Sequence, residues 1–159
     1  MTSKITSVTL PDSGVTLQIK RISPMLLVDL RKQLKRGIAK PQPPLQEVLI
    51  GDEKKMQPNE AHPDYLAALQ DYNADIGQLY IEAIIYLGVE CEIDAASVLA
   101  LRESDLGEFL PKSDKVVYVS RIACESERDL TLMQNAILGR AQPTEAAVGE
   151  SAESFPSQV

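Results

Sequence analysis

The sequence has 159 residues and a formal net charge of −7, and this length favours one compact domain with short tails. Leu, Ile, Val and Phe account for 44 of the 159 residues, or 28%, which is above the roughly 20% below which disorder is expected. An acidic chain without a long basic run is a poor nucleic-acid binder, and the sequence has no run of about 18 apolar residues that would span a membrane.

The two cysteines and the single histidine predict no cofactor and no metal site. Cys91 and Cys124 belong to no CxxC motif or Cys/His cluster, so the ligands for a structural zinc ion are missing. Cys91 lies between two glutamates, which disfavour a thiolate, and Cys124 is expected to be a small core residue.

His62 could act as a general base oriented by Asp64 or Glu60. The favoured interpretation is a loop residue just before a helix that has Pro63 in its first turn. No GxSxG, Walker A or HExxH motif accompanies it. We therefore expect no enzyme and no catalytic residue.

The first 22 residues predict a β-hairpin over residues 4–22. Two alternating segments, Lys4–Leu10 and Val15–Ile22, flank a turn at Pro11–Gly14, where proline and glycine supply turn conformations. The expected inward-facing residues are Ile5, Val8, Leu10, Val15, Leu17 and Ile19. Because a lone hairpin is marginally stable in water, the apolar face of this one must rest on a helix or pair with another chain.

A helix is predicted after Ser23 and Pro24, which suit the N-cap and the first helical position. The cations near its end (Lys32, Lys35, Arg36 and Lys40) complement the helix dipole and are too few for a nucleic-acid patch. Residues 37–61 are rich in Pro and Gly and predict a long loop with a short strand at Glu47–Ile50. Pro41–Pro44 is expected to be a connector, with a polyproline II ligand surface as the alternative.

Residues 63–87 form the most periodic segment of the chain. Apolar residues follow a +4, +3 spacing in Tyr65, Leu69, Tyr72, Ile76, Leu79, Ala83 and Tyr86, which is typical of a helical seam. This seam predicts either a central core helix or a surface for a partner helix. The partner-binding candidates are Tyr65, Leu69, Tyr72, Ile76, Leu79 and Tyr86.

The remaining chain predicts three further helices and a tail. Asp94 and Ser126 are expected N-caps, and Asp129 supplies the acid three residues after Ser126. Residues 115–124 are rich in β-branched side chains and so resemble a strand, but the preceding Ser113 favours a helix. The predicted fold class is α+β, mainly α, with a single domain at 1–139 whose helical part covers 23–139, followed by a flexible tail at 140–159.

Three local patterns resemble the small tail assembly chaperones of long-tailed bacteriophages. The first is the Leu10–Gly14 turn leading into Arg21–Lys32, and the second is Asn59–Leu69 at the start of the long helix. The third is Asp129–Leu138 followed by Ala141–Val148 and Glu153–Phe155. Together these patterns cover about a third of the chain, and none is a catalytic signature.

The resemblance implies a protein that keeps the long, helical tape measure protein soluble and helps tail-tube subunits assemble around it. Its partners would be the tape measure protein and the major tail tube protein, in the cytoplasm of the host cell. In many relatives a frameshift adds a C-terminal extension, and residues 140–159 would be its place here. A homo-oligomer is compatible with this role, and a structural or adaptor protein of the virion is the alternative.

Overall fold

The computed structural model describes residues 4–140, in which helices predominate over strands. The N-terminal hairpin followed by helices is confirmed, and the fold class is α+β. The expected tail at 140–159 lies outside the described residues except for Arg140. The chain divides into two compact units. The first unit combines the residues up to Ser23 with those from Ile84 onward, and the second unit is Pro24–Ala83.

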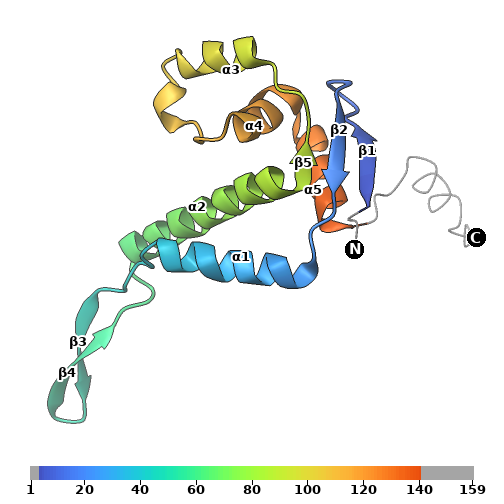
Figure 1. The fold of residues 1–159 in the computed structure, drawn as a ribbon. Coiled ribbons are helices and arrows are strands. Elements are labelled where there is room, and N and C mark those ends of the chain that lie inside the picture. Colours follow the sequence, from blue (N-terminus) through green and yellow to red (C-terminus); the bar gives the residue numbers. More distant parts are fainter. Residues whose placement is uncertain (1–3, 141–159) are drawn as a thin grey trace, which may run out of the picture. The chain divides into compact units, whose positions relative to one another are not determined.

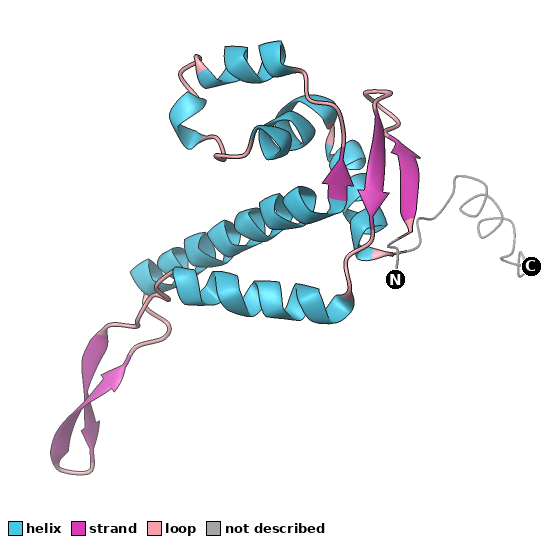
Figure 2. Ribbon diagram, viewed as in Figure 1, coloured by secondary structure: helices cyan, strands magenta, loops and turns pink. Residues whose placement is uncertain are grey.

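The first unit contains a three-stranded antiparallel sheet in the order β1-β2-β5 (Figure 2). Its strands are β1 (Ile5–Thr9), β2 (Thr16–Lys20) and β5 (Val89–Glu90). The hairpin is therefore supported by a third strand of the same chain, which the sequence did not predict. The helix α5 (Glu127–Leu138) also contacts it, because the N–H of Ile22 donates to the carbonyl of Ile137 at 3.1 Å.

Alternation along the hairpin explains which side chains are buried. Leu10, Leu17 and Ile19 are buried in the core of the first unit. The prediction that Ile5 faces inward is wrong, because its side chain is 52% exposed. Ile5 is three positions from Val8, and side chains an odd number of positions apart point to opposite faces of a strand.

Short helices complete the first unit, and their caps confirm the local sequence signals. Asp94 caps α3 (Ala95–Arg102), Ser113 caps α4 (Asp114–Val117), and Ser126 caps α5. The remaining elements are the 3₁₀ turn η1 (Gly107–Phe109) and the π-helical segment η2 (Tyr118–Ala123), which follows α4 directly. The helical prediction for residues 115–124 is therefore right, with a π-helix in its second half.

The second unit contains two helices and a second hairpin (Figure 1). Its elements are α1 (Pro24–Gly37), β3 (Leu45–Ile50), β4 (Glu53–Pro58) and most of α2 (Pro63–Gly88). Within this unit α1 and α2 run beside each other in opposite directions, and the hairpin lies beyond the end where α2 begins. The guanidinium of Arg31 lies 4.6 Å from the centre of the Tyr80 ring, which links the two helices.

The expected loop at 37–61 is mostly a hairpin. β3 and β4 pair in register from Leu45 with Pro58 to Ile50 with Glu53, and Gly51 takes the positive φ of 65° that the turn requires. The predicted short strand at Glu47–Ile50 is confirmed, but its partner strand was missed. The sequence of β4, EKKMQP, has no apolar alternation that would indicate a strand.

Candidate partner-binding surfaces

The two units differ in how much of their chain is buried. Every buried hydrophobic side chain of the described residues lies in the first unit, including Ile84, Ile85, Met133 and Ile137. None of residues 24–83 is buried. A 60-residue domain ordinarily buries about 60% of the surface that its unfolded chain exposes. The second unit therefore has no fully buried side chain, and its most covered apolar residues are half-buried.

The six partner-binding candidates do not share one environment. Tyr65, Leu69, Tyr72 and Ile76 are half-buried along one side of α2. Leu79 is 37% exposed, and it lines an open hollow of about 260 Å³ together with Ile38, Asp75 and Gln78. The first five candidates belong to the second unit, whereas the sixth, Tyr86, belongs to the first.

Tyr86 lies in the first unit beside a cation. Its side chain is exposed, and the ammonium of Lys115 lies 5.0 Å from the centre of its ring. The same ammonium donates a hydrogen bond of 2.6 Å to the backbone carbonyl of Tyr86. A cation over a ring face stabilises the pair by an electrostatic attraction, so Tyr86 already has a partner within its own chain.

The second hairpin presents an apolar face that sequence reasoning did not find. Leu45 and Leu49 point to the same face of β3, and the register places Met56 of β4 on that face as well. All three side chains are exposed. The ammonium of Lys54 lies 3.5 Å from the carboxylate of Glu47 on that face, and this exposed ion pair contributes little to stability. The signal that could have found the hairpin is Gly51-Asp52 between two six-residue segments.

The helices of the second unit also separate charge. α1 carries four cations (Arg31, Lys32, Lys35 and Arg36) and a single acid, Asp29. α2 carries four acids (Asp64, Asp71, Asp75 and Glu82) and no Lys or Arg. A partner that makes apolar contacts with this unit would therefore also meet the basic helix α1 and the acidic helix α2. The charges of that partner would decide which of the two helices it prefers.

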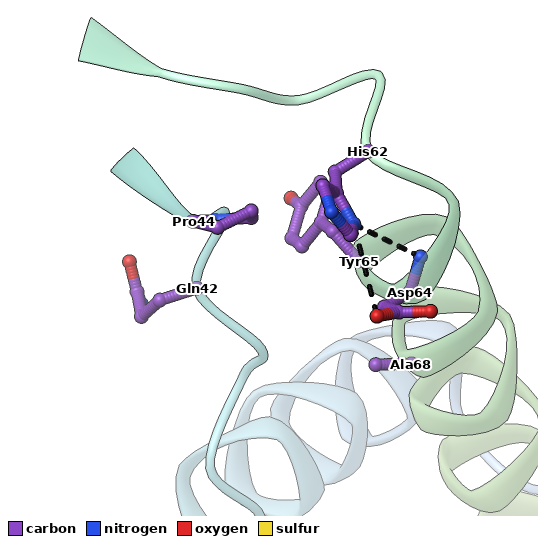
Figure 3. Close-up of a pocket in the computed structure, with 6 residues that line it drawn as sticks. All are labelled: Gln42, Pro44, His62, Asp64, Tyr65 and Ala68. Atoms are coloured by element: carbon purple, nitrogen blue, oxygen red, sulfur yellow. Dashed lines mark hydrogen bonds and ion pairs between the residues drawn. The ribbon is translucent and has the colours of Figure 1, made fainter. Parts of the chain in front are cut away.

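His62 lies in an open hollow of about 260 Å³ at the start of α2 (Figure 3). Its Nδ1 accepts a hydrogen bond of 3.2 Å from the backbone N–H of Asp64, and its carbonyl accepts from the N–H of Leu66 at 3.0 Å. These are the bonds of a helix N-cap residue. The side chain thus has a capping role, and it lies just before the helix as the sequence predicted.

The remaining lining of this hollow includes no Ser, Thr, Cys or Lys side chain. It consists of Gln42, Pro44, Asp64, Tyr65 and Ala68 together with His62. The carboxylate of Asp64 lies 4.0 Å from Nδ1 of His62, and Glu60 does not line the hollow. The arrangement can accept a small apolar or aromatic side chain of a partner between Pro44 and Tyr65, which face each other in Figure 3.

The two cysteines are separate thiols in the first unit. Burial, together with the negative charge of Asp129, raises the pKa of Cys124 to about 12. Burial also raises the pKa of Cys91, although the Lys115 cation opposes the change. Neither thiol is therefore activated as a nucleophile. Within residues 4–140, no three Cys, His, Asp or Glu side chains come together as metal ligands would.

Comparisons with known proteins identified no relative of this chain. The chain matches no protein-family model, no curated protein and no solved structure. No helix in the described part of the chain combines the length and the apolar character needed to cross a bilayer.

Proposed function

We propose that this protein is a tail assembly chaperone of a long-tailed bacteriophage. It would bind the tape measure protein in the cytoplasm of the infected cell, keep that protein soluble, and promote assembly of the tail tube around it. The proposal combines the resemblance of three local sequence patterns with one structural observation. That observation is the complete absence of buried residues from Pro24–Ala83, where apolar side chains line two helices and a hairpin.

The surface of the second unit suits an elongated helical client. The half-buried stripe of α2 from Tyr65 to Ile76 and the exposed Leu79 follow helical spacing. A helix of the client can place its own apolar residues against such a stripe. The apolar face of the β3–β4 hairpin adds Leu45, Leu49 and Met56 to the surface available for this contact.

The strength of the contact fits a chaperone that must later be displaced. Covering roughly 400 Å² of apolar surface gives on the order of 10 kcal/mol, and lost motional freedom offsets much of this gain. Each contact is then reversible. Several copies on one long client would still hold it firmly, because linked sites increase the apparent affinity.

Co-expression with the tape measure protein tests the proposal. The wild-type chain should keep the client in the soluble fraction, and the combined variant Leu49→Glu with Leu79→Glu should return most of it to the pellet. Both residues are exposed, so the substitutions should leave the fold intact. Ile5→Thr is the matched control, because it removes an exposed apolar side chain from the first unit and keeps a β-branched residue in the strand.

Two results would count against this function. A client that is equally insoluble with and without the protein would reject the chaperone role. Recovery of the protein in stoichiometric amounts from purified virions, detected by mass spectrometry, would favour a structural or adaptor protein instead. His62→Ala should largely preserve client solubility, because the loss of one helix cap costs only about 1 kcal/mol. Turnover of a small substrate that this variant abolishes would favour the enzyme alternative instead.

A further inference from the structure

Two apolar side chains of the first unit are displayed to solvent on one short turn. Leu106 is 61% exposed and Phe109 is 77% exposed. The N–H of Phe109 donates to the carbonyl of Leu106 at 3.0 Å, in the 3₁₀ turn η1. Side chains three positions apart on a 3₁₀ turn lie directly above one another. Leu106 and Phe109 therefore form a single apolar projection, called the Leu106–Phe109 knob below.

The loop that carries the knob is held in place by Arg102. The guanidinium Nη2 donates to the carbonyls of Pro111 and Lys112 at 3.0 and 3.1 Å, and to the carboxylate of Asp114 at 2.7 Å. Gly107 packs so closely that a Cβ there would lie 2.0 Å from the carbonyl oxygen of Arg102. The knob is thus exposed on an ordered loop. Preorganisation of this kind lowers the entropy lost when a partner binds.

The charges around the knob specify the chemistry of that partner. Glu103, Asp105 and Glu108 are exposed neighbours of the knob in the sequence, and no Lys or Arg occurs from Glu103 to Pro111. An apolar projection surrounded by carboxylates favours a partner surface that has apolar residues next to cations.

The outer face of α1 has this composition. Met25 and Val28 are exposed apolar residues, and Lys32, Lys35 and Arg36 follow them at helical spacing on the same side. The half-buried residues of α1, Leu27, Leu30 and Leu34, lie on the other side of the helix at the same spacing. The outer face of α1 is therefore an apolar patch that continues into a cationic one, with Asp29 as the acid on the same side.

We propose that the Leu106–Phe109 knob of one copy docks on the outer face of α1 of a second copy. Phe109 and Leu106 cover Met25 and Val28, and the surrounding carboxylates lie near the three cations. The two surfaces differ, so the contact is heterologous and leaves one knob and one α1 face free on each pair. Such contacts propagate into a chain of copies or close into a ring. This inference does not depend on the identity of the client.

Sedimentation velocity of the full chain over a concentration series tests the contact. The wild-type chain should sediment faster as its concentration rises, and this trend should weaken at high salt. Phe109→Ser removes the knob, and the double variant Lys32→Glu with Arg36→Glu alters the opposing face. Each should weaken self-association by about tenfold or more. Leu26→Ser is the control, because it removes an exposed apolar side chain from another side of α1 and should associate as the wild type does.

Mixing the two variants distinguishes a heterologous contact from a symmetric one. The Phe109→Ser chain keeps an intact α1 face, and the Lys32→Glu, Arg36→Glu chain keeps an intact knob. Their equimolar mixture should form pairs that grow no further, because the two remaining surfaces are both defective. A wild-type chain that stays monomeric throughout, or a mixture that associates no more than either variant alone, would overturn the proposal. Circular dichroism confirms that each variant is folded.

Discussion

The carboxylate of Asp129, at the start of α5, accepts the backbone N–H of Asp12 at 2.9 Å, although 117 positions separate the two residues in the chain. The same carboxylate accepts from the N–H of Ser13 at 3.2 Å and from that of Glu125 at 3.1 Å. The hydroxyl of Ser126 also donates to the side chain of Asp12. The turn of the N-terminal hairpin is thereby fixed to the beginning of the last described helix.

Asp129 should make the protein sensitive to acid. Burial alone would raise the pKa of its carboxyl, but the donors at Asp12, Glu125 and Ser13 together lower it. A carboxyl whose folded pKa is lowered stabilises the protein above its unfolded pKa of about 3.9, and this contribution is lost as the pH falls through the folded value. Asp129→Asn should therefore lower the urea midpoint at pH 7, and the difference from wild type should shrink towards pH 3.

Glu127→Gln provides the control for this experiment. Glu127 is an exposed acid in the same helical turn, so its replacement should change the urea midpoint far less. Equal effects of the two substitutions at pH 7 would mean that the carboxylate of Asp129 stabilises the fold only through the helix dipole.

The two thiols should differ in reactivity. Cys124 is buried and has a pKa of about 12, so maleimide should not modify it in the folded protein at pH 7.5. Cys91 is only half-buried and should react slowly. Intact-mass spectrometry should show one label without denaturant and two in urea. Two labels without denaturant would show that the region around Cys124 opens readily.

The pKa of Cys124 also sets an alkaline limit to stability. Because its folded pKa exceeds the unfolded value of about 8.5, the neutral thiol stabilises the fold below that pH, and the contribution is lost as the pH rises towards 12. Cys124→Ala should therefore show a smaller fall in urea midpoint between pH 8 and pH 10 than the wild-type chain shows. An identical fall in both chains would contradict the assignment.

Two glycines of α2 should respond to alanine in opposite directions. A Cβ at Gly88 would lie 2.7 Å from Cγ2 of Ile137 and 3.2 Å from the carbonyl oxygen of Lys20, so Gly88→Ala should destabilise the protein by about 1–3 kcal/mol. At Gly77 a Cβ would meet no atom within 4 Å beyond its chain neighbours and the adjacent backbone of its own helix. Gly77→Ala should stabilise by about 1 kcal/mol, because it improves the helix propensity. Urea denaturation measures both, and a stabilising Gly88→Ala would contradict the close packing.

Hydrogen exchange should separate the two units. The amides of α1, a helix without a buried residue, should exchange about tenfold faster or more than those of α5, which buries Met133 and Ile137. Mass spectrometry of peptic fragments provides the measurement. Equal protection of α1 and α5 in a monomeric sample would show that the second unit is stabilised by something other than its own burial.

Much of the fold follows from local sequence signals. Proline and glycine at the first turn and the caps Asp94, Ser113 and Ser126 act within a few residues of where they stand, so a single sequence reveals them. The role of Asp129 could not be predicted in full, because its donors Asp12 and Ser13 belong to the other end of the chain.

The surfaces were harder to predict than the elements. The helical spacing from Tyr65 to Ile76 predicted a stripe, but spacing alone cannot show whether a core or solvent meets it. The structure leaves it half-buried. Leu106 and Phe109 gave no periodic signal, because they lie in a loop held by Arg102 through contacts with the backbone at Pro111 and Lys112.

The opposite charges of α1 and α2 make the surface of the second unit electrostatically asymmetric. A client helix that carries its own charged stripe would meet attraction in one orientation and repulsion in the reverse one. Under the proposed function, the protein would then select which end of a client segment faces the hairpin as well as which segment it covers. At physiological salt, where screening acts over about 8 Å, this choice of polarity would be made only at close range, after the first encounter.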